Sequence, residues 1–240
     1  MYTRILRTNI LVSILFLFLS GCSSERSWRY SVDSYPTDRH PLLSKRVAVP
    51  PFRDLRPDKN ENTFLLAILP LVPFGWVDYS TPELEYQKLA TLPVWQFKFA
   101  EDFAKAAAEE LDASNLFKEA FFTSSASAGD LVLRGDIKST RYWGKVFSYG
   151  FSINAPGLWF LGLPQGTIHN ELEVEFTLVD QANGVLLWNK SYKMAYHKSP
   201  FWIYKIPSDF DYDNMFKAMM RDVVKSLEST LSDSAVLDSR

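Results

Sequence analysis

The clearest pattern along the chain is an alternation of apolar and polar residues between positions 171 and 179. Leu172, Val174, Phe176 and Leu178 alternate with three glutamates and Thr177. Successive side chains of a strand point to opposite faces of a sheet. The pattern therefore predicts a strand with one buried face and one solvated face.

The residues after this strand predict that the chain turns back on itself. The segment 180–184 is rich in turn-forming residues, and an aromatic-rich returning strand is expected over 185–196. Three further segments carry strand patterns: Lys45–Phe52, Lys118–Thr123 and Asp130–Trp143. Pro50 and Pro51 end the first of them, because proline cannot donate to a sheet ladder. Gly135 marks a candidate bulge in the last.

Two segments have helical spacing instead. Between residues 96 and 112, Phe99, Phe103 and Leu111 recur at intervals that place them on one helix face. Near the carboxyl end, a second apolar stripe consists of Phe216, Met219, Met220, Val223, Val224 and Leu227. This order of elements predicts an α+β fold, with a mostly antiparallel sheet and two main helices packed on one face.

The amino terminus has the three parts of a secretory signal. Arg4 and Arg7 precede an apolar run, and the small residues Ser20 and Gly21 precede Cys22. A transmembrane anchor over residues 5–20 is the alternative, but that stretch is shorter than the roughly 20 residues needed to cross a bilayer. We therefore expect residues 1–21 to be removed as a signal peptide.

This amino terminus resembles that of bacterial lipoproteins, which implies that cleavage occurs between Gly21 and Cys22 and that Cys22 is acylated. Three acyl chains would hold the protein to a membrane, whereas a single chain would be marginal. In that class an aspartate directly after the cysteine usually retains the protein at the inner membrane, and here Ser23 follows. The resemblance thus implies an outer-membrane location, on the periplasmic face.

Charge and composition limit the partners of the mature chain. Loss of Arg4 and Arg7, with no acidic residue, changes the formal charge from −2 to −4. That balance argues against nucleic acid as a partner. Acylation of the single cysteine, Cys22, leaves no thiol for a disulfide. We expect a flexible tether over residues 22–44, one domain over 45–233 and a polar tail over 234–240.

Two inserts rich in apolar residues, proline and glycine interrupt the predicted elements. Residues 64–76 contain no charge, and residues 146–163 form a second such segment. The candidate partner or membrane surface consists of Phe64, Leu65, Leu69, Phe74, Trp76, Phe147, Tyr149, Phe151, Leu158, Trp159 and Phe160. The inserts can meet as one exposed surface or fold back into the core. The alternation over residues 147–153 also suits a membrane-inserted strand.

The search for catalytic chemistry finds little. His40, His169 and His197 have no spacing that joins them at a metal, and no phosphate-binding glycine loop or serine elbow is present. The glutamates of the alternating strand suit a solvated face, and Arg53 and Arg56 suit a turn network with neighbouring aspartates. We therefore expect a protein that is not an enzyme and has no cofactor or metal.

Four segments carry a resemblance to a broad group of Gram-negative lipoproteins: "RVAVPPFRDLRP", "FAEDFAKAAAEEL", "GDLVLRGDIKSTRY" and "LVDQANGVLLW". Over roughly residues 45–233 the chain is similar to proteins that share a sheet-and-helix domain with the amino-terminal domain of TolB, with the curli secretion lipoprotein CsgG and with auxiliary lipoproteins of lipid transport. The resemblance implies a role in the cell envelope.

The hypothesis from the sequence is a lipid-anchored periplasmic domain that serves as an adaptor or accessory subunit of an envelope complex for transport, secretion or assembly. Its partners would be the membrane, through acylated Cys22, and an envelope protein. Two alternatives stay open: an oligomeric pore-forming secretion lipoprotein, and a lipoprotein that binds lipid or glycan. The sequence leaves the oligomeric state and the identity of the partner open.

Overall fold

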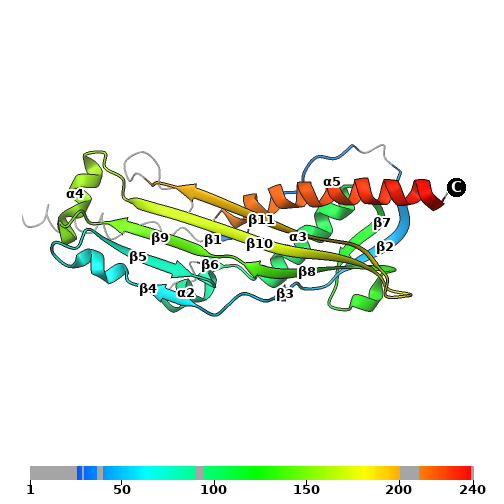
Figure 1. Cartoon of the computed structure of the whole chain (residues 1–240), viewed down its shortest axis with the longest axis horizontal. Helices are drawn as coiled ribbons and strands as arrows, with labels where there is room; N and C mark the ends of the chain where they lie inside the picture. Colours follow the sequence, from blue (N-terminus) through cyan, green and yellow to red (C-terminus); the bar gives the residue numbers. More distant parts are fainter. Residues whose placement is uncertain (1–25, 29, 37–39, 90–94, 201–210, 239–240) are drawn as a thin grey trace, which may run out of the picture.

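A long antiparallel hairpin forms the spine of the molecule. The computed structural model describes residues 26–28, 30–36, 40–89, 95–200 and 211–238. Strand β10 (Gly166–Asp180) pairs with β11 (Leu186–Lys198) along nearly its whole length. Figure 1 shows β10 extending through most of the elongated molecule. The predicted strand over 171–179 and its returning partner are confirmed, and both are longer than the alternation alone indicated.

The other edge of β10 carries two strands placed end to end. Strand β8 (Leu131–Ser139) pairs with the second half of β10, and β9 (Tyr142–Phe147) pairs with the first half. The single strand predicted over 130–143 was therefore wrong. The break falls at Thr140, a buried residue whose hydroxyl accepts a hydrogen bond from Arg56 and whose carbonyl accepts one from the Tyr212 hydroxyl.

The bulge predicted at Gly135 was also wrong. Gly135 pairs regularly with Phe176, and the register with β10 shifts at Lys138 instead. Gly135 has a different role, because a Cβ atom there would lie 2.4 Å from the Phe52 ring. The glycine lets this aromatic side chain lie directly on the sheet.

The two ends of the sheet differ in strand direction. At one end, β2 (Leu43–Val49) pairs in parallel with β8 and with β7 (Phe117–Phe122), and β3 (Arg53–Asp54) rejoins β8 after the prolines. At the other end, β9 continues antiparallel to β5 (Phe74–Tyr79), and β5 to β4 (Asn60–Asn62). The result is a mixed, mostly antiparallel sheet in an α+β fold, as expected.

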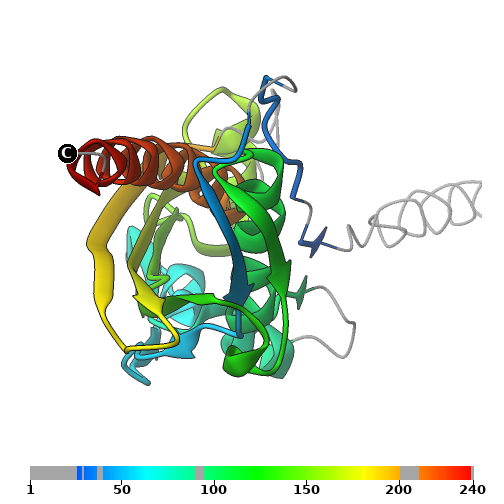
Figure 2. The same cartoon turned by 90° about the vertical axis from the view of Figure 1, so that its right-hand side faces the viewer.

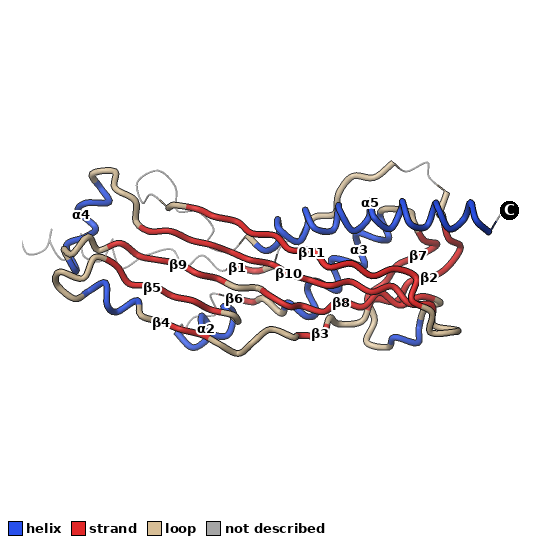
Figure 3. Tube along the Cα trace, viewed as in Figure 1, coloured by secondary structure: helices blue, strands red, loops and turns tan. Residues whose placement is uncertain are grey.

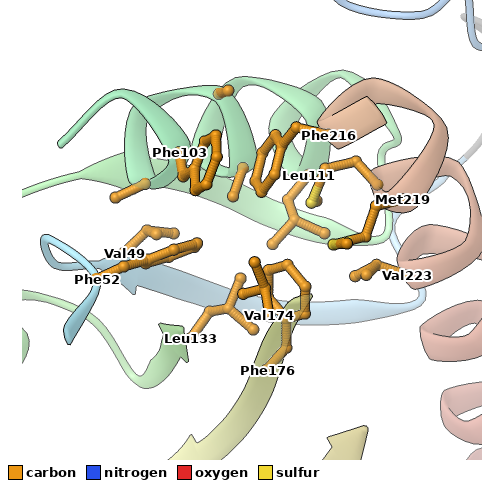
Figure 4. Packing of buried hydrophobic residues seen from close by; sticks show 14 of the residues in the cluster. Val49, Phe52, Phe103, Leu111, Leu133, Val174, Phe176, Phe216, Met219 and Val223 are labelled. Atoms are coloured by element: carbon orange, nitrogen blue, oxygen red, sulfur yellow. The ribbon is translucent and has the colours of Figure 1, made fainter. Parts of the chain in front are cut away.

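Helices α3 (Phe99–Ala113) and α5 (Tyr212–Asp238) contribute most of the helical part of the core. Helix α3 contacts β2 and β7, α5 contacts β10 and β11, and the two helices contact each other. Figure 2 shows the sheet in end view, with α5 running along its β11 side. The rings of Phe103 and Phe216 stack at 4.3 Å, above Val174 and Phe176 of β10 (Figure 4).

The segment expected to be a tether is docked on this core in its described part. The Trp28 ring lies 5.3 Å from the Phe103 ring. The hydroxyls of Tyr30 and Tyr35 donate to the carboxylate of Glu110, which is fully buried in α3, at 2.7 and 2.6 Å. We call the described residues 28 and 30–36 the strap. The expectation of a free tether over 22–44 is therefore wrong for the strap.

Ion pairs and a short strand pair also hold this segment. Asp33 accepts hydrogen bonds from Arg221 and lies 3.2 Å from the Lys217 ammonium, both on α5. Hydrogen bonds from Arg221 lower the pKa of Asp33 to about 2. Strand β1 (Arg26–Ser27) pairs in parallel with β6 (Trp95–Gln96) just before the strap. Aromatic and charged residues thus fix a stretch that lacks sequence periodicity.

The carboxyl end also differs from the expectation. Helix α5 continues to Asp238, so most of the polar tail expected over 234–240 is helical. No proline or glycine occurs after Tyr212 to end the helix. Figure 3 shows α5 extending beyond the strands at the end of the molecule opposite α4 (Ala155–Phe160).

Candidate interaction surface

The two apolar inserts meet at one end of the sheet. We call residues 64–73 and 148–165, which lie beyond the ends of β5, β9 and β10, the tip (Figure 1). The Leu71 amide donates to the Gly150 carbonyl at 3.0 Å, and the Ser148 amide donates to the Pro73 carbonyl at 2.8 Å. The Ser152 hydroxyl donates to the Ile68 carbonyl. Of the two alternatives left open by the sequence, the structure has the inserts in contact.

Short helical turns build the tip. The first insert forms the 3-10 helix η1 (Phe64–Ile68), and the second forms η3 (Ser152–Asn154) followed by α4. The membrane strand suggested by the alternation over 147–153 is absent from this described segment, because β9 ends at Phe147. Ser148 directly after it turns the chain by bonding to the Val72 carbonyl at 2.5 Å.

The backbone of the tip contains unusual conformations. Among the described residues other than glycine, four have positive φ, and three of these lie in the tip: Leu71 at 67°, Tyr149 at 55° and Ser152 at 54°. This region of backbone space is uncommon for residues with a Cβ atom and persists where surrounding contacts impose it. Backbone hydrogen bonds between the two inserts supply those contacts and display Leu71 outward.

The apolar side chains of the tip are exposed. Leu71, Leu161, Ile153 and Leu65 keep 89, 81, 77 and 70% of their surface accessible. The tip residues that are large, hydrophobic and exposed are Phe64, Leu65, Ile68, Leu69, Leu71, Phe151, Ile153, Phe160, Leu161 and Leu163. The alternative that both inserts fold back into the core was therefore wrong for these residues.

The candidate surface divides into exposed and half-buried members. Five of the predicted residues are exposed: Phe64, Leu65, Leu69, Phe151 and Phe160. Six are half-buried, at or behind the strand ends: Phe74, Trp76, Phe147, Tyr149, Leu158 and Trp159. The predicted surface did not include five exposed residues of the same two charge-free runs: Ile68, Leu71, Ile153, Leu161 and Leu163. The lipidation and cleavage positions, Cys22 and Gly21, lie outside the described residues.

Four side-chain donors of the tip are bonded within the tip or at its base. The Trp159 indole donates to the Phe147 carbonyl at 3.0 Å, and the Tyr149 hydroxyl donates to the Pro164 carbonyl at 2.7 Å. The hydroxyls of Ser148 and Ser152 donate to carbonyls of the first insert. These donors need no water or partner, so the surface that the tip presents is mainly hydrocarbon.

Aromatic and cationic side chains lie directly behind the tip. Trp76 pairs with Lys145 across β5 and β9, and the Lys145 ammonium lies 4.8 Å from the Phe74 ring and 5.1 Å from the Trp143 ring. From Val146 to Ile168 the sequence contains no charged residue. Lys145 is therefore the first charge that β9 presents behind its apolar end.

The structure also brings together two histidines that the sequence reasoning left apart. His169 and His197 face each other across β10 and β11, with their Nδ1 atoms 3.2 Å apart, and the His169 ring lies 4.7 Å from Trp143. Burial lowers the pKa of His169, and repulsion from His197 and Lys145 lowers it further. A regular register counted back from the turn between Asp180 and Val185 would have placed His169 opposite Tyr196, and the shift at Leu178 brings His197 opposite instead.

A hollow of about 450 Å³ lies over the histidine pair, lined in part by Arg141, Trp143 and Tyr196. Among the described residues, no group of three or more His, Cys, Asp and Glu side chains is placed to hold a metal ion. None of the helices in the described ranges combines the length and apolar composition needed to cross a membrane.

The charged residues noted in the sequence form ion pairs. The Lys193 ammonium, on β11, lies 3.0 Å from a carboxylate oxygen of Glu171 and 3.3 Å from one of Glu173, both on the half-exposed face of β10. Arg56, whose side chain is only 4% exposed, pairs with Asp54 at 2.7 Å and with Glu83 at 2.6 Å. The predicted turn network around Arg56 is confirmed.

Comparisons with known proteins include a distant structural likeness. No protein-family model matches the chain, and no curated protein matches it significantly. Among solved structures it is similar to the crystal structure of protein XCC0632 from Xanthomonas campestris, which is described under the family model DUF330. The two share 11% identity with a TM-score of 0.49, over 86% of this chain and 97% of the other.

Proposed function

We propose that this chain is a lipid-anchored envelope protein at the periplasmic face of the outer membrane, where it acts as a non-enzymatic adaptor. In this role its tip contacts a second apolar surface. The observation that carries the proposal is the tip itself, with ten large hydrophobic side chains exposed on two charge-free inserts. Exposed apolar patches of this kind mark sites that bind a partner or a membrane.

The fold supports an adaptor with two different ends. We take α3 and α5 to cover the same face of the sheet, which the stacked rings of Phe103 and Phe216 favour. The tip lies at the end of β10 away from its pairing with β8. Apolar residues there add little to that core. Their exposure lowers solubility, and a function that uses them accounts for their presence.

The docked strap supports a short connection between the lipid anchor and the folded domain. If Cys22 is acylated, only three residues lie between it and Arg26, where β1 begins, and the four steps from Cys22 to Arg26 reach at most about 14 Å. The expected tether of more than twenty residues would have reached roughly 60–70 Å. A strapped domain would stay beside the membrane that carries its lipid, where an envelope partner or the bilayer itself is within reach of the tip.

The relation to lipoproteins with a TolB-like or CsgG-like domain remains part of this proposal. The quoted sequence segments support it: "RVAVPPFRDLRP" covers the second half of β2 and all of β3, and "FAEDFAKAAAEEL" covers most of α3. Both segments belong to the end of the molecule that contains the core. The tip belongs to the two inserts that interrupt the resemblance.

Site-specific photocrosslinking in cells tests the proposed contact. A photoreactive amino acid at Leu71 should give adducts with a protein or with phospholipid, because this side chain is 89% exposed at the tip. The same amino acid at Leu186 is the matched control, since Leu186 is also exposed but lies at the turn end of β11. Adducts at neither site, or equal adducts at both, would contradict a function located at the tip.

A further inference from the structure

We propose that the second surface is a lipid bilayer and that the tip is a membrane wedge, which inserts its aliphatic side chains among the acyl chains. This inference rests on the proposed function, because it assumes a domain held beside a membrane, and it names the partner of the tip. A protein groove is the competing occupant. Three features of the tip favour lipid.

The first feature is the kind of side chain that protrudes farthest. Leu71, Leu161, Ile153 and Leu65 are the most exposed large hydrophobic residues at the tip, and all are aliphatic. Tryptophan and tyrosine, which dominate the energetic centres of protein interfaces, are half-buried behind them. A front led by aliphatic residues, with tryptophan and tyrosine behind it, matches the order from hydrocarbon to headgroup in a bilayer.

The second feature is the internal bonding of polar groups. Hydrocarbon offers no hydrogen-bond partner, so a segment that enters it must satisfy its polar groups internally. The hydroxyls of Ser148, Tyr149 and Ser152 and the indole of Trp159 all donate to backbone carbonyls at the tip or its base. These bonds use donors that a protein partner would otherwise engage.

The third feature is a pair of cations at matching depth on the two faces of the sheet. Lys145 pairs with Thr167, and Lys198 pairs with the next residue, Ile168, so the two lysines point to opposite faces. Along β9, these positions lie two and three residues behind Phe147, or roughly 7 and 10 Å at the usual strand rise. A wedge immersed as far as Phe147 would therefore keep both ammonium groups behind the hydrocarbon boundary, on the headgroup side.

Depth-dependent fluorescence on the acylated full-length mature chain tests the wedge. Leu71→Cys and Ile153→Cys each carry a polarity-sensitive nitrobenzoxadiazole label, with Leu186→Cys as the matched exposed control. The proteins are reconstituted into vesicles of phosphatidylethanolamine and phosphatidylglycerol, with or without a nitroxide on the lipid acyl chain. We expect blue-shifted emission and loss of most fluorescence to the nitroxide at 71 and 153, and neither effect at 186.

Opposite results would overturn the wedge. Labels at 71 and 153 that remain in water in these vesicles exclude insertion, and a protein adduct at Leu71 in cells would then leave the adaptor function standing with a protein partner. Quenching that is equal at all three positions would mean nonspecific adsorption and would also overturn the proposal.

Two controls distinguish a failure of the lipid anchor from a failure of insertion by the tip. The chain without an added cysteine should take up no label, because acylation consumes the Cys22 thiol, and labelling of this parent would count against the lipid anchor itself. Adding Leu71→Asp to the Ile153→Cys protein should return the 153 label to water, because a charge is costly in hydrocarbon. A label that stays quenched despite this charge would contradict insertion by the tip.

Discussion

Glu110 shows how single residues fix the amino-terminal strap. Its carboxylate has no exposed surface, and it accepts hydrogen bonds from the hydroxyls of Tyr30 and Tyr35 and from the Asp33 amide, on a segment about eighty residues away in sequence. A buried charge without such donors would be costly. Burial, and then the hydrogen bond to Glu110, raise the pKa of both tyrosines, so both hydroxyls stay protonated and continue to donate.

Removing one of these donors should destabilise the fold. We expect Tyr30→Phe to lower the free energy of unfolding by about 1.5–3 kcal/mol, because a buried carboxylate loses a charge-assisted hydrogen bond. Tyr192→Phe is the control, since the Tyr192 hydroxyl makes an exposed bond of 3.2 Å to the Asp222 carbonyl and should cost about 0.5–1 kcal/mol. Urea denaturation measures both. Equal losses would argue against the role assigned to Glu110.

The histidine pair predicts a pH dependence of stability. The pKa of His169 is lower in the folded protein, so below the usual value of about 6.5 the unfolded chain binds more protons. The free energy of unfolding should therefore fall as the pH drops through 6.5, until the pH reaches the pKa that His169 has in the folded protein. Melting temperatures between pH 5 and 7.5 should decline less steeply in His197→Gln, which removes one source of repulsion. An unchanged slope of melting temperature against pH would show that His197 does not affect the protonation of His169.

At the scale of elements, periodicity predicted the segments that one buried face defines. Strand β10 and helix α3 both appear where alternation and helical spacing placed them. The strap was missed because Trp28, Tyr30 and Tyr35 follow neither period. The wrong strand over 147–153 shows the opposite error. There the residues alternate, but bonds to the first insert turn the chain, and sequence spacing does not reveal that insert's position.

The close packing of the Phe52 ring on Gly135 of β8 gives a test at the scale of elements. Gly135→Ala should destabilise the protein by about 1–3 kcal/mol, because the new methyl group would clash with the buried Phe52 ring. Gly157→Ala is the matched control. Nothing lies within 4 Å of its Cβ position, and alanine in helix α4 should be neutral or stabilising by up to about 1 kcal/mol. Thermal melts of both variants check the pair, and a tolerated alanine at 135 would contradict the packing.

At the scale of the molecule, one sheet connects a hydrophobic core at one end to an exposed apolar surface at the other. Its parallel end carries the core with α3 and α5, and its antiparallel end carries the tip, with α4 and η1 beyond the strands (Figure 1). The candidate surface was predictable from the sequence as two charge-free inserts. Its exposure was not, because the hydrophobic content of the inserts suits a core equally well. Only the arrangement of η1, η3 and α4 decides which side chains face outward.

The central claim is that this domain is held to a membrane by a lipid on Cys22. The most direct test is the intact mass of the protein purified from cell membranes. We expect a chain that begins at Cys22 and carries the added mass of a diacylglycerol and one further acyl chain. A chain that retains residues 1–21, or one whose Cys22 carries no lipid, would contradict it.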